Sequence, residues 1–210
     1  MIKVGIDFSV TSPSICIEKD GHYEFLSFFD DGGKDYTKSK SKKYQYHNMI
    51  SDIVELIPYT RNIDKSDYRS EQKTKMSSAR NIARLIVDKL KEKIRNEEVI
   101  IGIEGFSYGS ISSSTLDLTL YQSFLRIKLL EEFGDDCIVI ISPSEGKKKF
   151  SGKGNANKDI MIQSFIENRI NDSEIENNEL WKFCAKNELD YKNIKPIDDL
   201  VDSFGILKSI

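Results

Sequence analysis

The chain has 210 residues, of which 39% are hydrophobic and 31% are charged. This balance is typical of a folded globular domain and excludes a largely disordered chain. The length is sufficient for one domain with a full core, so we expect a single domain over residues 1–210. The apolar runs are far shorter than the ~20 residues that cross a bilayer, and we expect no membrane association.

Cysteine and histidine are too sparse for most disulfide or zinc chemistry. The three cysteines form no CxxC pair, and only two histidines accompany them, which argues against a zinc site. An odd, low number of cysteines is typical of a reducing compartment. Met1 leads straight into the first predicted strand, with no room for a signal peptide, so we expect a cytoplasmic protein.

Charge is distributed unevenly along the chain. The formal net charge is only −3, but residues 34–95 contain 16 basic and 8 acidic residues, whereas residues 167–202 contain 10 acidic and 5 basic ones. This polarity favours a phosphate-facing surface and a separate acidic region. Two solvated faces explain the composition equally well, so charge alone does not decide between these interpretations.

The first third of the chain predicts strands followed by a long irregular stretch. Apolar patterning predicts three strands, at 2–10, 14–19 and 22–29. Residues 30–70 are polar and basic, with a short helix predicted near 47–57. Because this stretch is too long for an ordinary loop, we expect an insertion or a mobile segment there.

The rest of the chain alternates helices with buried strands. Helical spacing of apolar residues predicts an amphipathic helix over 71–95, with Arg80 and Arg84 on its polar side. Continuous β-branched runs predict buried strands at 99–106 and 137–142. The remaining predictions are helices at about 113–133, at 157–170 and from Pro196 onward, and a second insertion or mobile segment at 171–195.

Together these elements predict an α/β fold. A unit of antiparallel strands comes first, and parallel strands alternating with helices follow. We expect a mixed five-stranded sheet, with its first three strands antiparallel and the others parallel, flanked by helices on both faces.

Two carboxylates lie within strands that should be buried. Asp7 in GIDFS and Glu104 in GIEGF occupy matching positions, each after Gly-Ile. A buried charge is costly unless it has a partner, so each acid needs a metal ion or a salt bridge. In the last helix Asp199 and Asp202 are spaced i, i+3 and share a face, although alone they would fit a solvated first turn. Asp198 fits a helix N-cap better than a spare ligand.

If the last helix packs beside the first and fourth strands, the four acids converge. Converging anions repel one another strongly, so such a cluster predicts a divalent cation. Oxygen ligands without His or Cys favour Mg²⁺, with Mn²⁺ as a substitute, over zinc. Two such ions about 4 Å apart would activate water and stabilise the leaving oxygen in phosphodiester cleavage.

The stretches GIDFSVTSPSICI, GIEGF and DDLVDSFGI resemble, in this order, the acidic motifs of the RNase H-like nuclease superfamily. They are most similar to those of RuvC-type Holliday junction resolvases, particularly the divergent forms carried by phages. SPSEGKKKFSGKGNANKDIM also resembles the resolvase loop, in which lysines and a Gly-x-Gly-x-Ala-x-Lys pattern precede a helix. The resemblance implies an RNase H-like fold and a Mg²⁺-dependent crossover junction endodeoxyribonuclease that acts on branched DNA in recombination and repair. For a phage-encoded chain, the expected location is the host cytoplasm.

Carried over residue by residue, the resemblance implies roles for individual side chains. Asp7, Glu104, Asp199 and Asp202 correspond to the catalytic metal ligands, and Lys158 to a catalytic contact at the scissile phosphate. We expect DNA contacts from Lys147, Lys148, Lys149, Lys153, Phe106, Tyr108, Arg80 and Arg84. A flexible basic loop without a catalytic role, and a core position for Phe106, remain open alternatives.

In the family, the helix that corresponds to 113–133 contributes to a two-fold dimer. Such a dimer would match a two-fold symmetric junction, so we expect a homodimer. The apolar residues of this helix are equally compatible with a monomer in which the helix is buried.

Three other functions fit parts of the sequence. Another RNase H-like nuclease, acting on flap or fork DNA or on RNA–DNA hybrids, would use the same four acids. An actin-like ATPase or sugar kinase also begins with Gly-Ile-Asp, but needs a second domain and a second glycine-rich phosphate motif. A non-catalytic nucleic-acid-binding protein has no feature in its favour while all four acids are present.

Overall fold

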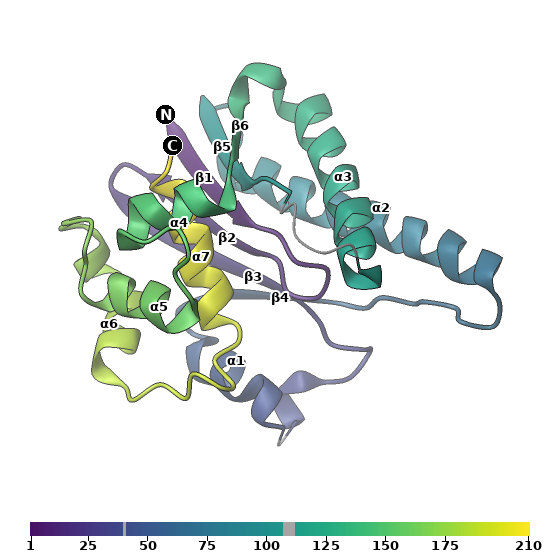
Figure 1. Ribbon diagram of the computed structural model, residues 1–210, viewed down its shortest axis with the longest axis horizontal. Coiled ribbons are helices and arrows are strands. Elements are labelled where there is room, and N and C mark those ends of the chain that lie inside the picture. The colour runs from purple at the N-terminus through teal and green to yellow at the C-terminus, as the bar shows by residue number, and fades with distance from the viewer. Residues whose placement is uncertain (40, 107–111) are drawn as a thin grey trace.

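The computed structural model describes residues 1–39, 41–106 and 112–210 (Figure 1). It contains one mixed sheet of six strands in the order β4-β3-β2-β1-β5-β6. The strands are β1 (Ile2–Asp7), β2 (Ser14–Lys19), β3 (His22–Asp30), β4 (Glu55–Tyr59), β5 (Val99–Glu104) and β6 (Ile138–Ile141).

Most of the strands point the same way. The pairs β1–β2 and β2–β3 are antiparallel, whereas β3–β4, β1–β5 and β5–β6 are parallel. Every strand except β2 therefore ends at the same edge of the sheet. Side chains that follow or close these strands, such as Asp7 and Glu104, are brought together there.

Helices cover both faces of the sheet (Figure 1). One face packs against α2 (Tyr68–Ile94) and α3 (Ser113–Phe133), which share a core with Ile2, Val4 and Ile6 of β1. A second core lies on the other face, around the last helix. The helices on that side are α1 (Gln45–Ile50), α4 (Pro143–Ser151), α5 (Lys158–Ile166), α6 (Glu179–Lys186) and α7 (Ile197–Leu207). Four short 3₁₀ helices are Tyr36–Lys38, Lys42–Tyr44, Asp135–Cys137 and Ile175–Asn177.

Two glycines allow α7 to lie close to the sheet. Gly5 of β1 and Gly102 of β5 are paired across the parallel ladder, and both face α7. A Cβ on Gly5 would be 2.2 Å from the backbone oxygen of Ser203, and one on Gly102 would be 3.2 Å from Ile206. Because side chains alternate along a strand, the acids two residues later, Asp7 and Glu104, face the same helix. In the Gly-Ile-acid pattern, the glycine thus lets α7 approach the strand closely, and the acid places a carboxylate at the end of that strand.

The predicted α/β class is confirmed, and so is the antiparallel arrangement of the first three strands. The expected number of strands was wrong, because residues 30–70 contain β4, which pairs with β3 at one edge of the sheet. The helix expected near 47–57 is only the six residues of α1. The lysine-rich segment that precedes α5, expected to be a loop, contains α4, and the acidic segment 171–195 contains α6.

Among the residues that the structure describes, no helix is both long and apolar enough to cross a membrane.

The close approach of α7 to β1 predicts that Gly5→Ala destabilises the fold. The new methyl group would overlap the α7 backbone at Ser203 and Leu207, and such overpacking costs roughly 2 kcal/mol or more. Chemical denaturation should therefore show a lower free energy of unfolding. The matched control is Gly146→Ala in α4, whose added Cβ would be no closer than 3.4 Å to its neighbours. Equal stability of the two variants would contradict this account of the packing.

Candidate active site

Four carboxylates meet where α7 crosses the ends of β1 and β5. Asp7 is the last residue of β1 and Glu104 the last residue of β5, and these strands are neighbours. Asp199 and Asp202 are one turn apart on α7, which packs on the same strands. The sequence prediction that these four residues converge is supported by their electrostatic coupling: Asp199, Asp202 and Glu104 all raise the pKa of Asp7.

Burial is the first cause of the perturbed acidities in this cluster. It raises the pKa of Asp7 well above its usual value, and the three neighbouring carboxylates raise it further. Burial, and then Asp198, raise the pKa of Asp199 to about 6. Burial, followed by Asp199 and Asp198, raises the pKa of Asp202 to about 7. Closely spaced buried anions each make ionisation of the others harder, so this site favours cations.

Asp199 is held on both of its carboxylate oxygens. The Ser12 hydroxyl, in the loop after β1, donates to Oδ2 over 2.8 Å. The ammonium of Lys195 donates to Oδ1 and also lies 3.4 Å from Oδ2 of Asp198. Neither Ser12 nor Lys195 was predicted from the sequence. Ser12 meets Asp199 only through the fold, whereas Lys195 is spaced i, i+4 from Asp199, a local signal that could have indicated their contact.

Asp198 is buried in the first turn of α7, and the N-cap role favoured for it was wrong. The N-cap is Pro196, with no side-chain cap hydrogen bond. Asp198 instead accepts a hydrogen bond from Lys158, while its Oδ1 atom has no hydrogen-bond partner. Its side chain is only 2% exposed, so it is a fifth buried carboxyl group in the cluster, and it raises the pKa of Asp199 and Asp202.

The backbone at Glu104 is fixed from the opposite face of the sheet. Its carbonyl oxygen accepts hydrogen bonds from Gln122 Nε2 at 2.7 Å and from Arg126 Nη2 at 2.8 Å, both from α3. The Arg126 guanidinium also lies 4.0 Å from the centre of the Phe106 ring. These contacts fix the position of the end of β5, and therefore that of the Glu104 carboxylate. Gln122 and Arg126 were not predicted from the sequence, because only the apolar residues of α3 were considered.

Two of the predicted lysines lie at the carboxylates. Lys147 of α4 lines a small pocket together with Glu104 and Asp202, and its charge lowers the pKa of both acids against the opposing effect of burial. Lys158, the first residue of α5, donates to Asp198. The ammonium groups of Lys147 and Lys158 thus approach the site from two different helices.

Other predicted contact residues lie away from the carboxylates or outside the description. Lys149 donates to the Ser209 carbonyl oxygen over 2.8 Å, beyond the end of α7. Lys148 and Lys153 are exposed. Arg80 and Arg84 are exposed on α2, which covers the opposite face of the sheet from α7, so the structure does not bring them to this site. Tyr108 lies outside the described residues.

Phe106 is half-buried beside a larger hollow next to the site. This hollow is lined by Phe106, Arg126, Ile140 and residues 142–145. It borders the end of β5 on the side of α3. The aromatic ring and the guanidinium above it both line this hollow. The base-stacking role of Phe106 stays a prediction.

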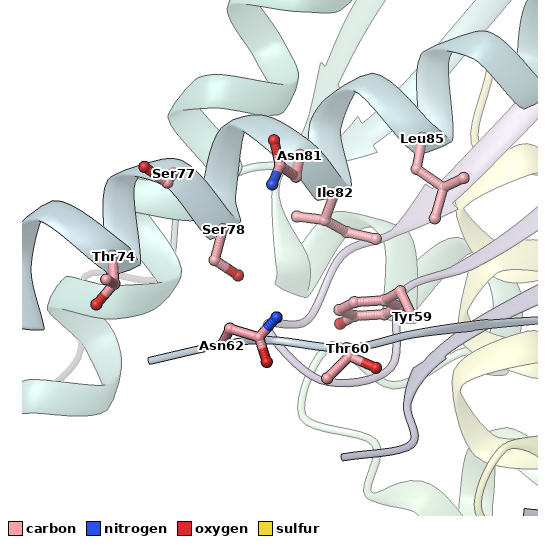
Figure 2. Close-up of a pocket in the computed structure, with 9 residues that line it drawn as sticks. All are labelled: Tyr59, Thr60, Asn62, Thr74, Ser77, Ser78, Asn81, Ile82 and Leu85. Carbon is pink, nitrogen blue, oxygen red and sulfur yellow. The ribbon is translucent and has the colours of Figure 1, made fainter. Parts of the chain in front are cut away.

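A separate cavity of about 230 Å³ lies between α2 and the chain that follows β4 (Figure 2). In Figure 2, Ser78 and Ile82 of α2 face Asn62 and Tyr59 across this space. Its nine lining residues include no acidic or basic side chain, and the Tyr59 hydroxyl donates to the Val10 carbonyl oxygen over 2.7 Å. This cavity therefore lacks the groups for acid–base or metal chemistry, and it is not part of the carboxylate site.

The carboxylate cluster has the donor set that Mg²⁺ and Mn²⁺ prefer. All of its ligand atoms are oxygens, and the repulsion seen in the raised pKa values would be relieved by added positive charge. As the side chains are placed, however, no three acidic, His or Cys residues of the described chain surround a single metal position. Asp199 is occupied by Lys195 and Ser12 instead. The residues fit a divalent cation chemically, and binding requires these side chains to rearrange.

No family model matches the sequence, and no curated protein matches it. Two solved structures have a similar fold. RuvC of T. thermophilus, in complex with a Holliday junction substrate, aligns with a TM-score of 0.50 and 8% sequence identity over 100% of this chain and 92% of its own. The yeast mitochondrial Holliday junction resolvase Ydc2 aligns with a TM-score of 0.52 and 16% identity over 99% of this chain and 76% of its own. The predicted RNase H-like architecture is thereby confirmed, and the chain has the fold of the RuvC-type resolvases.

Proposed function

We propose that the chain is a metal-dependent endonuclease that cleaves four-way DNA junctions and related branched DNA. The observation that carries this proposal is the convergence of Asp7, Glu104, Asp199 and Asp202 at one edge of a RuvC-type fold, with Lys147 and Lys158 beside them. Buried carboxylates that repel one another need cations, and ammonium groups next to them suit a phosphate substrate. The folds of RuvC and Ydc2 support the choice of junction DNA.

In this proposal the carboxylates would hold Mg²⁺, or Mn²⁺ in its place. Two bound ions would supply an activated water and stabilise the leaving oxygen of the phosphodiester. Asp7 and Glu104 are suited to hold ions rigidly, because both close a strand and the Glu104 backbone is fixed by Gln122 and Arg126.

The lysines would act on the substrate itself. Lys147 and Lys158 carry positive charge to the rim of the carboxylate cluster from α4 and α5. An ammonium group placed there neutralises charge on the scissile phosphate and stabilises charge that develops in the transition state. Lys158 is paired with Asp198, so it must leave that carboxylate in order to contact DNA.

We further propose that the protein acts as a homodimer through α3. Leu116, Ile127 and Leu130 are 62%, 55% and 40% exposed, and their spacing places them on one face of the helix. The other face of α3, with Tyr121 and Leu125, is buried against the core. An exposed apolar stripe of this kind is typical of an interaction surface, and a two-fold pairing of the same helix would bury it.

Cleavage assays test the proposed activity. Purified protein with Mg²⁺ should introduce paired symmetric nicks into an end-labelled four-way junction, and Asp7→Asn should reduce the rate at least roughly a hundredfold because a metal ligand is lost. Asp88→Asn, at an exposed position of α2, is the matched control and should cleave like the wild type. If the protein cuts flaps or RNA–DNA hybrids but not junctions, the proposed substrate is wrong. Cutting that does not need metal would refute the proposed mechanism.

The raised pKa of Asp202 predicts a pH-dependent stability without metal. Its carboxyl binds a proton more tightly in the folded protein, where the pKa is about 7 against a usual 3.8. This contribution to stability is present at low pH and is lost as the pH rises from about 4 through 7. Asp202→Asn cannot ionise, so at pH 8 in EDTA it should be more stable than the wild type, by up to about 4 kcal/mol, while its cleavage is lost.

Denaturation at pH 5 and pH 8 measures this difference. The gain in unfolding free energy should be much larger at pH 8 than at pH 5. Asp159→Asn, exposed on α5, serves as the control and should show no such difference. If Asp202→Asn is less stable than the wild type by the same amount at both pH values, Asp202 is not an ionised buried group.

The dimer proposal predicts that a charge on the α3 stripe dissociates the protein. Ile127→Glu would place a carboxylate in the apolar interface, and it should weaken dimerisation at least roughly tenfold in analytical ultracentrifugation. Met76→Glu is the matched control, because Met76 is 52% exposed on α2, outside the stripe. A wild-type protein that stays monomeric at high concentration would contradict the proposal.

A further inference from the structure

Lys195 places a positive charge inside the carboxylate cluster. It lies just before α7, and its ammonium donates to Oδ1 of Asp199 while lying 3.4 Å from Oδ2 of Asp198. The Lys195 side chain is 40% exposed, whereas those of Asp198 and Asp199 are 2% and 7% exposed. The ammonium group therefore covers two buried carboxylates from the solvent side.

The charge of Lys195 acts on more than its two contacts. It lowers the pKa of Asp199 and, across the site, that of Asp7 on β1. Burial alone would lower the pKa of Lys195, but Asp199 and Asp198 outweigh this effect and hold the pKa above its usual value. Lys195 is thus a permanent cation at neutral pH, and it offsets part of the mutual repulsion of the acids.

Lys195 occupies an oxygen that the proposed metal centre needs. Asp199 has two carboxylate oxygens, of which Oδ2 accepts from Ser12 and Oδ1 from Lys195. A divalent ion at Oδ1 would lie within a few ångströms of the ammonium group, where like charges repel strongly. A lysine side chain is long and flexible enough to swing outward and keep its charge in water.

The charge balance of the site also favours the departure of Lys195 when divalent ions bind. When all are ionised, Asp7, Glu104, Asp198, Asp199 and Asp202 supply five negative charges, and Lys147, Lys158 and Lys195 supply three positive ones. One divalent ion balances the remainder. A second ion would make the centre positive, unless an ammonium group leaves it. Lys195 is the ammonium group in direct contact with a predicted metal ligand.

We propose that Lys195 is a tethered counter-cation that holds Asp199 in the metal-free protein and is displaced from it when divalent ions bind. The proposal rests on the metal centre of the proposed function. In this proposal Lys195 provides positive charge to the acids when no metal is bound. The lysine thereby stabilises the empty site and weakens metal binding.

Isothermal titration with Mn²⁺ at pH 8 tests this competition. Lys195→Met removes the competing charge, so its dissociation constant for Mn²⁺ should fall roughly tenfold or more, the effect of no longer breaking a charge-assisted hydrogen bond. Lys195→Arg keeps the charge and should bind no more tightly than the wild type. Lys192→Met, at an exposed position three residues earlier, is the matched control and should leave the affinity unchanged.

A second measurement uses the wild-type protein alone. The ¹⁵N NMR signal of the Lys195 ammonium group, assigned with Lys195→Arg, should be protected from rapid exchange without metal and should lose this protection at saturating Mg²⁺. A signal that persists at saturation would overturn the proposal, whatever the stability of the Lys195→Met variant.

The outcomes separate this proposal from the proposed function. If Lys195→Met binds Mn²⁺ no more tightly than the wild type, while Asp7→Asn abolishes binding, the metal centre stands and the counter-cation role is refuted. If neither the wild type nor Lys195→Met binds Mn²⁺, both proposals are refuted. Tight binding by Lys195→Met alone would support the competition most directly.

Discussion

The repulsion among buried carboxylates is the constraint on which the rest of this structure depends. Five acids lie together where α7 crosses the ends of β1 and β5, and burial and their neighbours raise the pKa values of Asp7, Asp199 and Asp202. Such a cluster weakens the fold unless cations balance it. The hydrophobic cores on both faces of the sheet supply the stability that offsets it. A site with this conflict between stability and local charge is typical of function.

Sheet topology decides which carboxylates meet. Because all strands except β2 run in one direction, Asp7 and Glu104 end adjacent strands at one edge. Gly5 and Gly102 then let α7 approach closely enough to add its own acids. This part of the site could be predicted from the sequence. A carboxylate after Gly-Ile in an apolar run is unusual, which marks Asp7 and Glu104, and the i, i+3 spacing of Asp199 and Asp202 places them on one face of a helix.

Other parts of the fold and site were not predictable in the same way. β4 is an edge strand that contains Pro58 and is only half-buried, so neither hydrophobicity nor alternation marked it. α4 was predicted as a loop because of its lysines and Gly146, although Ser142 and Glu145 form the start of a helix and Gly152 its end. Ser12 acts only through a contact formed by tertiary packing, and no local pattern marks it. Lys195 is spaced i, i+4 from Asp199, but this spacing does not reveal that Asp199 is buried in a cluster of acids. Residues that break a local sequence pattern could therefore be predicted as part of the site, whereas residues that conform to such a pattern could not.

The hydrogen bond between Ser12 and Asp199 joins residues that are 187 positions apart in the sequence. A contact of such long range closes a large loop of chain, and non-local contacts of this kind slow folding. Any partly folded species in which α7 is detached would lack Asp199 and Asp202 while keeping Asp7 and Glu104. The carboxylate centre is therefore complete only in the fully assembled fold, and a molecule in which α7 is locally unfolded keeps only half of it.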